Sequence, residues 1–204
     1  MTKQALPPPQ PGTLTLVLGG ARSGKSRLAE QLAALSDAPV VYLATAEAGD
    51  AEMQARIAAH RARRPPTWRT VEAPRELAAA LARLNVPPGS VVLLDCITLW
   101  LSNLLMEEPP PDEPTLLATA IRELEAVLAL VQARSWALVA VSNEVGGGLV
   151  PVYPLGRLYR DVAGRLNQWL AARAARVWLV VAGYALEVSA LGVRIPEGED
   201  DGVA

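Results

Sequence analysis

A phosphate-binding loop close to the start of the chain constrains its fold more than any other feature. Residues 19–26 read Gly-Gly-Ala-Arg-Ser-Gly-Lys-Ser, which is the complete pattern G-x-x-x-x-G-K-S. An apolar run over 14–18 precedes the loop, and a segment with helical periodicity begins at residue 25. In this strand–loop–helix context, the glycines allow backbone N–H groups to point inward at phosphate oxygens. The sequence therefore predicts a binding site for a nucleoside triphosphate.

Two side chains of the loop have separate expected roles. Lys25 is expected to reach the β- and γ-phosphates, and the hydroxyl of Ser26 is expected to lie on Mg²⁺. The helix that starts here adds the partial positive charge of its N-terminus to the site. The predicted nucleotide-binding residues of the loop are Gly19, Gly20, Ala21, Arg22, Ser23, Gly24, Lys25 and Ser26.

Apolar runs alternate with helical segments along the rest of the chain. The predicted strands are 14–18, 40–44, 68–72, 91–95, 136–142 and 176–182. The predicted helices are 25–35, 50–63, 75–84, 97–106, 114–134 and 156–175. This order indicates an α/β fold of the RecA-like P-loop NTPase class, with a mostly parallel sheet and helices on both faces. The segments 185–189 and 193–195 predict an antiparallel hairpin at the edge of the sheet.

Length and composition limit the number of domains and the kinds of partner. The chain has 204 residues, of which 51% are hydrophobic, so we expect one catalytic domain, over 13–195. Residues 1–12 are rich in proline and are expected to form a disordered tail, while 196–204 read as an acidic tail. The net charge of −2 gives no support for nucleic-acid binding.

The cellular location is also predicted from composition. No apolar segment is long enough to span a bilayer, and the first twelve residues do not resemble a signal peptide. The single cysteine, Cys96, excludes an internal disulfide and fits a reducing compartment. Because Cys96 directly follows an apolar run, we interpret it as a core residue. The predicted location is the cytoplasm.

The apolar run 91–95 ends in an acid, which is the form of a Walker B strand. Asp95 would emerge at the carboxyl end of the sheet, on the side of the phosphate loop, where it is expected to hold Mg²⁺ through water. The alternative is an ordinary strand that ends in a turn aspartate. Up to this point the sequence is compatible with a small-molecule kinase, a nucleotide-driven switch or a motor.

The only histidine, His60, lies in a helical segment rich in arginine. Arginines at positions 56, 61, 63 and 64 form a cluster suited to phosphate, and they disfavour protonation of the imidazole. A neutral imidazole beside a bound triphosphate is able to form a phosphoramidate. The alternative is a surface histidine on a solvated basic helix, and the residues alone leave both readings open.

Several segments taken together show the pattern of a known enzyme family. They are Gly19–Arg27, Tyr42–Ala46, the histidine segment from Glu52 to Glu72, Ser142–Gly146 with Gly148 and Pro151, and Arg160–Gln168. These segments resemble the bifunctional adenosylcobinamide kinase/adenosylcobinamide-phosphate guanylyltransferases of cobalamin biosynthesis. The resemblance implies phosphorylation of the aminopropanol hydroxyl of adenosylcobinamide with ATP or GTP. It then implies transfer of GMP from GTP, through a covalent histidine–GMP intermediate, with release of pyrophosphate.

The resemblance also implies roles for individual residues. His60 aligns with the guanylylated histidine, Arg61 and Arg64 would neutralise charge on the nucleotide, and Glu72 would contact the guanine or ribose. Thr45 would line the same cleft. The implied substrate contacts are Asn143 and Glu144, with Glu144 as a base toward the substrate hydroxyl.

The chain departs from this family's pattern at two positions. The family often has glutamate where Asp95 stands, and some members have a second histidine where Ala59 stands. The resemblance implies a corrinoid substrate and a homo-oligomer, a trimer. Two other functions stay open: a single-activity kinase in which His60 only contacts substrate, and a RecA-like regulatory ATPase that needs a protein partner.

Overall fold

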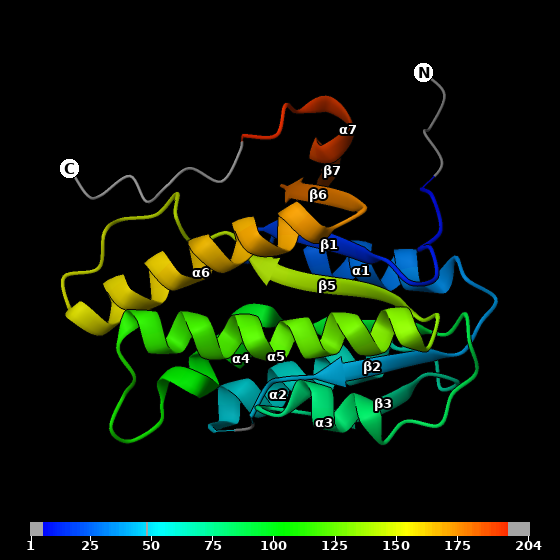
Figure 1. Cartoon of the computed structure of the whole chain (residues 1–204), viewed down its shortest axis with the longest axis horizontal. Coiled ribbons are helices and arrows are strands. Elements are labelled where there is room, and N and C mark those ends of the chain that lie inside the picture. The colour runs from blue at the N-terminus through cyan, green and yellow to red at the C-terminus, as the bar shows by residue number, and fades with distance from the viewer. Residues whose placement is uncertain (1–5, 48, 196–204) are drawn as a thin grey trace.

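A seven-stranded sheet forms the centre of the protein in a computed structural model, which describes residues 6–47 and 49–195 (Figure 1). The strands are β1 Leu14–Gly19, β2 Val40–Ala44, β3 Arg69–Glu72, β4 Val91–Asp95, β5 Ala137–Asn143, β6 Arg176–Val181 and β7 Tyr184–Glu187. Their order across the sheet is β3-β2-β4-β5-β1-β6-β7, and all pairs are parallel except β6–β7. The carboxyl ends of the parallel strands therefore meet at one edge of the sheet.

The described helices connect the strands, and two of them, α2 and α5, begin at a side-chain cap. The described helices are α1 Lys25–Ala34, α2 Ala51–Arg63, α3 Leu77–Ala82, α4 Ile97–Leu105, α5 Glu113–Ala133, α6 Pro154–Arg173 and α7 Val188–Leu191. The carboxylate of Asp50 accepts from the N–H of Met53 at 2.7 Å, and that of Asp112 accepts from Thr115 at 2.9 Å. Such bonds satisfy N–H groups that have no partner within the helix.

The two faces of the sheet carry separate apolar cores. Leu14 and Leu16 of β1 point to a large core shared with α3, α4, α5 and α6, whereas Val17 points to a smaller core shared with α1. This division follows from the alternation of side chains along a strand. In α5 the buried residues recur every three or four positions, as expected for one face of a helix: Leu116, Ala120, Leu124, Val127 and Val131.

The predicted α/β class, the parallel strands and the antiparallel edge strand near the C-terminus are confirmed, but this strand does not have the partner that was predicted. Residues 184–187 do form a strand, which pairs with β6 rather than with 193–195. Ala182 and Gly183, with φ angles of +50° and +84°, make the tight turn between the two strands. Residues 188–191 are helical, and 193–195 have no regular structure.

The terminal segments were predicted as tails. Residues 196–204 and 1–5 lie outside the described residues. Within residues 6–12, which have no regular helix or strand, Leu6 packs on the smaller core and the N–H of Gly12 donates to the carbonyl of Trp136 at 2.6 Å. Among the described helices, none is both long and apolar enough to cross a membrane.

Candidate active site

The phosphate loop is folded tightly before α1 begins. Arg22 and Gly24 have φ angles of +57° and +103°, so the backbone turns back on itself. Gly19 is required by space, since a Cβ atom there would lie 2.5 Å from the carbonyl oxygen of Val180. The ammonium of Lys25 donates to the carbonyl of Gly20 at 3.0 Å, which places it across the loop.

A cavity of about 480 Å³ opens beside this loop, at the carboxyl ends of β2, β4 and β5. Its volume is typical of a small-molecule site. It is lined by Lys25, Ser26, Tyr42, Ala44, Ala46, Glu47, Met53, Ile57, His60, Arg61, Arg64, Glu72, Pro74, Asp95, Cys96, Leu99 and Asn143. Most of the predicted site residues outside the phosphate loop are in this set.

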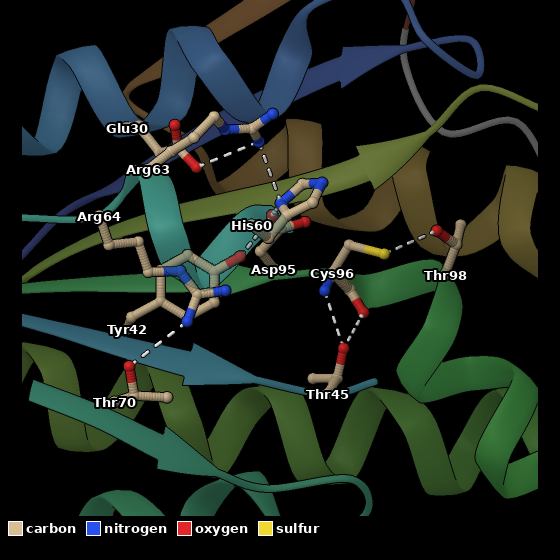
Figure 2. Close-up of polar contacts among 10 residues, drawn as sticks. All are labelled: Glu30, Tyr42, Thr45, His60, Arg63, Arg64, Thr70, Asp95, Cys96 and Thr98. Carbon is tan, nitrogen blue, oxygen red and sulfur yellow. Dashed lines mark hydrogen bonds and ion pairs between the residues drawn. The ribbon is translucent and has the colours of Figure 1, made fainter. Parts of the chain in front are cut away.

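The fold brings the predicted metal ligand and the lone histidine together. Asp95 ends β4, and its Oδ2 atom lies 4.0 Å from Nδ1 of His60, which comes from α2. The hydroxyl of Tyr42 donates to the same Oδ2 atom at 2.7 Å (Figure 2). Burial raises the pKa of Tyr42, and the charge of Asp95 raises it further, so the hydroxyl stays protonated and acts as the donor.

The imidazole of His60 also lies beside a cation. A guanidinium nitrogen of Arg63 is 3.3 Å from Nδ1, and the same guanidinium is 3.7 Å from the carboxylate of Glu30 on α1. Burial raises the pKa of Glu30, and Arg63 opposes that shift. Because a guanidinium only donates hydrogen bonds, Nδ1 is the acceptor wherever this contact is a hydrogen bond.

Two further arginines approach the cavity from the end of α2. The guanidinium carbon of Arg64 lies 3.2 Å from the centroid of the Tyr42 ring, and Nη1 of Arg64 donates to the hydroxyl of Thr70 at 3.3 Å. Arg61 forms an ion pair with Glu72 at the mouth of the cavity, where both side chains are more than half exposed. Glu72, which the resemblance assigned to the nucleotide, therefore has Arg61 as its partner in this structure.

The side chains around the loop fit a magnesium ion. The hydroxyl of Ser26 and the carboxylate of Asp95 line the same cavity as Lys25. Within residues 6–47 and 49–195, no group of three or more His, Cys, Asp or Glu side chains is close enough to form a metal site on its own. One carboxylate and one hydroxyl suit Mg²⁺, which keeps several waters and takes its other ligands from substrate phosphates.

Two of the predicted site residues, Thr45 and Glu144, are not among the residues that line the cavity. The side chain of Thr45 is buried, and its hydroxyl both donates to the carbonyl of Cys96 and accepts from its N–H, each at 2.8 Å. Thr45 thus joins the ends of β2 and β4 beneath the cavity. The carboxylate of Glu144 accepts from the N–H of Gly146 at 2.7 Å.

Asn143 and Cys96 do reach the cavity. The amide of Asn143 donates to the hydroxyl of Thr98 at 2.6 Å. Cys96 is 5% exposed, and burial raises the pKa of its thiol to about 11, so it remains a neutral thiol, as expected for a core residue.

Two residues of the site, Tyr42 and Glu30, were given no role from the sequence. Tyr42 has the pattern of a core residue in a strand, and Glu30 has the pattern of a surface residue on a helix.

The loop, the sheet order and the acid at the end of β4 define a P-loop nucleotide-binding protein of RecA-like architecture. The fold of this chain is similar to that of the RadB recombinase, with a TM-score of 0.50 at 20% sequence identity, over 84% of this chain and 75% of that one. At this identity the similarity concerns the fold alone.

The chain belongs to the cobinamide kinase/cobinamide phosphate guanyltransferase family, whose family model matches residues 15–188. It is 52% identical to the bifunctional adenosylcobalamin biosynthesis protein CobP of Pseudomonas aeruginosa, over 82% of this chain and 92% of the relative. It is 46% identical to the bifunctional adenosylcobalamin biosynthesis protein CobU of Escherichia coli, over 86% of this chain and 99% of the relative. The predicted family and its class, bifunctional kinase and guanylyltransferase, are confirmed.

Proposed function

We propose that this enzyme performs two successive group transfers at the one cavity. It phosphorylates the aminopropanol hydroxyl of adenosylcobinamide with ATP or GTP, and then transfers GMP from GTP onto that phosphate through a covalent intermediate on His60. The observation that carries the proposal is the meeting of His60 with Asp95, 4.0 Å apart, in the cavity that Lys25 and Ser26 also line. A kinase alone has no need of a nucleophile at this point.

In the first reaction the substrate hydroxyl attacks the γ-phosphorus and gives up its proton to water, while the bond from the γ-phosphorus to the bridging oxygen breaks and the nucleoside diphosphate leaves. Lys25 and the N–H groups of the loop stabilise the charge on the transferring phosphoryl group. Ser26 and Asp95 are the residues that would hold Mg²⁺, which neutralises phosphate charge when bound. Asn143, which lines the cavity, is the better supported substrate contact, because the carboxylate of Glu144 is held by Gly146.

In the second reaction a nitrogen lone pair of His60 attacks the α-phosphorus of GTP, and pyrophosphate leaves. Arg61 and Arg64 balance the charge of the nucleotide. An oxygen of the adenosylcobinamide phosphate then attacks the phosphorus of the histidine–GMP intermediate. The P–N bond breaks, the imidazole is restored, and adenosylcobinamide-GDP is released.

The test is to incubate the protein with Mg²⁺ and GTP labelled at the α-phosphate, beside His60→Ala and His60→Asn variants. We expect acid-labile, base-stable label on the wild type alone. GTP labelled at the γ-phosphate should still phosphorylate adenosylcobinamide with either variant. Absence of α-label on the wild type, with nucleotide binding intact, would show that His60 is not the nucleophile and leave a kinase or a regulatory ATPase.

The assembly and location of the enzyme are further parts of the proposal. A homo-oligomer is supported by apolar side chains that are almost fully exposed in the described chain, among them Leu149, Val152 and Val193. The trimer itself follows only from the resemblance, and light scattering after gel filtration measures it. The net charge of −2 supports a role without nucleic acid, and the free buried Cys96 suits the cytoplasm.

A further inference from the structure

Tyr42 makes two different contacts with two different parts of the site. It belongs to β2 and is 2% exposed, so its position is fixed by the core. Its hydroxyl donates to Oδ2 of Asp95 at 2.7 Å, while the face of its ring lies 3.2 Å from the guanidinium carbon of Arg64. Figure 2 shows the tyrosine between these two charged groups.

The hydrogen bond from the Tyr42 hydroxyl affects the orientation of the Asp95 carboxylate. Oδ2 faces both the tyrosine hydroxyl and Nδ1 of His60, the latter at 4.0 Å. Arg63 lies on the same side, 3.3 Å from that nitrogen. Without the hydroxyl, the carboxylate is able to turn toward these groups and pair with them. The hydrogen bond holds Oδ2 and leaves Oδ1 for the metal ion or its water.

The ring contact matters because the other described contacts of α2 are ion pairs and polar contacts of His60, Arg61 and Arg63. Neither apolar core includes a residue of α2 among the side chains that the structure describes. Nε of Arg64 is buried and has no hydrogen-bond partner, so the ring face is a main contact of this guanidinium beside the bond to Thr70. A guanidinium over an aromatic face is attracted to it, and more so when water is excluded.

We propose that Tyr42 is a positioning residue shared by the two reactions. Its hydroxyl orients Asp95 toward the metal, and its ring fixes Arg64 and with it the end of α2 that carries His60. The role of the ring rests on the proposed function, because only that function gives Arg64 and His60 a part in guanylyl transfer. The role of the hydroxyl concerns only Mg²⁺ and nucleotide.

Two substitutions separate the contacts. Tyr42→Phe removes the hydroxyl and keeps the ring, whereas Tyr42→Leu removes both. The readout is equilibrium binding of α,β-methylene-GTP with a fluorescent ribose, measured with Mg²⁺ and with EDTA. This analogue does not release pyrophosphate, so binding is separated from guanylyl transfer. For the wild type we expect Mg²⁺ to increase the affinity.

For Tyr42→Phe we expect this Mg²⁺-dependent gain to fall about tenfold to a hundredfold, the usual loss for one hydrogen bond to a charged group, with the EDTA affinity unchanged. In an Asp95→Asn background the same change should have no further effect. In an Arg64→Met background, Tyr42→Phe should reduce the Mg²⁺-dependent gain as much as it does in the wild type, because the hydroxyl contact is independent of the contact between the ring and Arg64. A gain equal to that of the wild type in Tyr42→Phe overturns the hydroxyl role.

The ring contact is tested with Arg64. We expect Arg64→Met to reduce the rate of α-label transfer to His60 in the wild type and in Tyr42→Phe, but not further in Tyr42→Leu. An equal loss in all three backgrounds overturns the ring role. If Tyr42→Leu does not fold, Tyr42→Trp, which keeps a ring face, should retain the Arg64→Met effect, and its loss there contradicts the proposal.

Tyr159→Phe is the matched control. Tyr159 is partly buried, and its hydroxyl donates to the carbonyl of Thr98 at 3.0 Å rather than to Asp95. Its removal should lower the melting temperature about as much as Tyr42→Phe does and leave the Mg²⁺-dependent gain unchanged. If wild-type protein takes up no α-label at all, the proposed function fails, while the binding measurements still decide the hydroxyl role.

Discussion

Two helices flank the cavity, and they are held in place by different interactions. α1 follows the phosphate loop and buries Leu28, Ala29, Leu32 and Ala33 against the sheet. α2 carries His60, and its described side chains contribute nothing to either core. Its contacts are polar: Arg63 with Glu30, Arg61 with Glu72 and His60 with Asp95, together with Arg64, directly after it, over Tyr42. The helix beside the phosphate loop is thus held by buried apolar packing, whereas the helix that carries His60 is held by polar contacts.

This difference suits an enzyme whose two reactions attack different phosphorus atoms. In the proposed reactions the triphosphate would be held by the phosphate loop, and the helix that follows this loop is packed in the core. The helix with His60 can be repositioned at the cost of a few polar contacts. We therefore expect α2, rather than the bound triphosphate, to adjust between the two reactions.

The largest expected effect concerns packing. Leu32→Ala on α1 should lower the free energy of unfolding by about 2–5 kcal/mol, because it leaves a cavity in a closed core. Ile57→Ala on α2 should change it by less than about 1 kcal/mol, since Ile57 lies on the open cavity. Urea denaturation measures both values. Similar losses for the two variants would contradict the contrast between the helices.

Lys25→Met should reduce activity without reducing stability, because Lys25 lies on α1, the helix that is held by apolar packing. We expect both transfer rates to fall by a factor on the order of 10²–10³, since one preorganised donor to the transferring phosphate is lost. Stability should hardly change, because methionine fills a similar volume and α1 stays anchored by its apolar face. Steady-state rates and a thermal melt report the two parts; a variant that unfolds instead would show that the lysine is a structural cation.

The pH dependence of stability tests the polar attachment of α2. Burial raises the pKa of Glu30 above its ordinary value. The unfolded chain therefore releases this proton first, and the contribution of Glu30 to stability is lost as pH rises through its titration range. Relative to Glu30→Gln, the wild type should become less stable as the pH rises above about 4, the ordinary range of a glutamate in the unfolded chain. A difference that grows with pH would show that the pairing with Arg63 outweighs burial.

The smallest effect is expected for the exposed ion pair. Arg61→Gln should lower the free energy of unfolding by less than about 0.5 kcal/mol, because Arg61 and Glu72 are both solvated. Arg64→Gln should lower it by about 1 kcal/mol, since its guanidinium lies over a buried ring. Chemical denaturation at low and at high salt compares the two arginines. Equal losses would show that the aromatic contact adds nothing.

The parts of the site that were predicted from sequence are those encoded locally. The phosphate loop needs a strand before it and a helix after it, and Asp95 is placed by the apolar run that precedes it. Both features are contained within a dozen residues. The family resemblance carried the assignment of His60, because periodicity alone could not separate it from a surface histidine.

The missed residues depend on contacts between distant segments. Tyr42 stands in register with Leu93 on β4, yet its hydroxyl reaches Asp95 two residues further along. Arg64 comes over its ring only because α2 returns to the sheet. Nothing in the sequence around Tyr42 indicates either partner. The edge hairpin was mispredicted for a related reason: 185–189 was paired with the segment after it, whereas β7 turns back onto β6.

The turn between β6 and β7 has a consequence for the newly made chain. Gly19 packs on the carbonyl of Val180, and the N–H of Gly183 donates to the carbonyl of Ser23 at 2.9 Å. The strand before the loop is paired on one side with β5 and on the other with β6, both from the last third of the sequence. While the ribosome is still adding these residues, the loop lacks its support, so a nascent chain gains affinity for nucleotide only when translation has passed the β6–β7 turn.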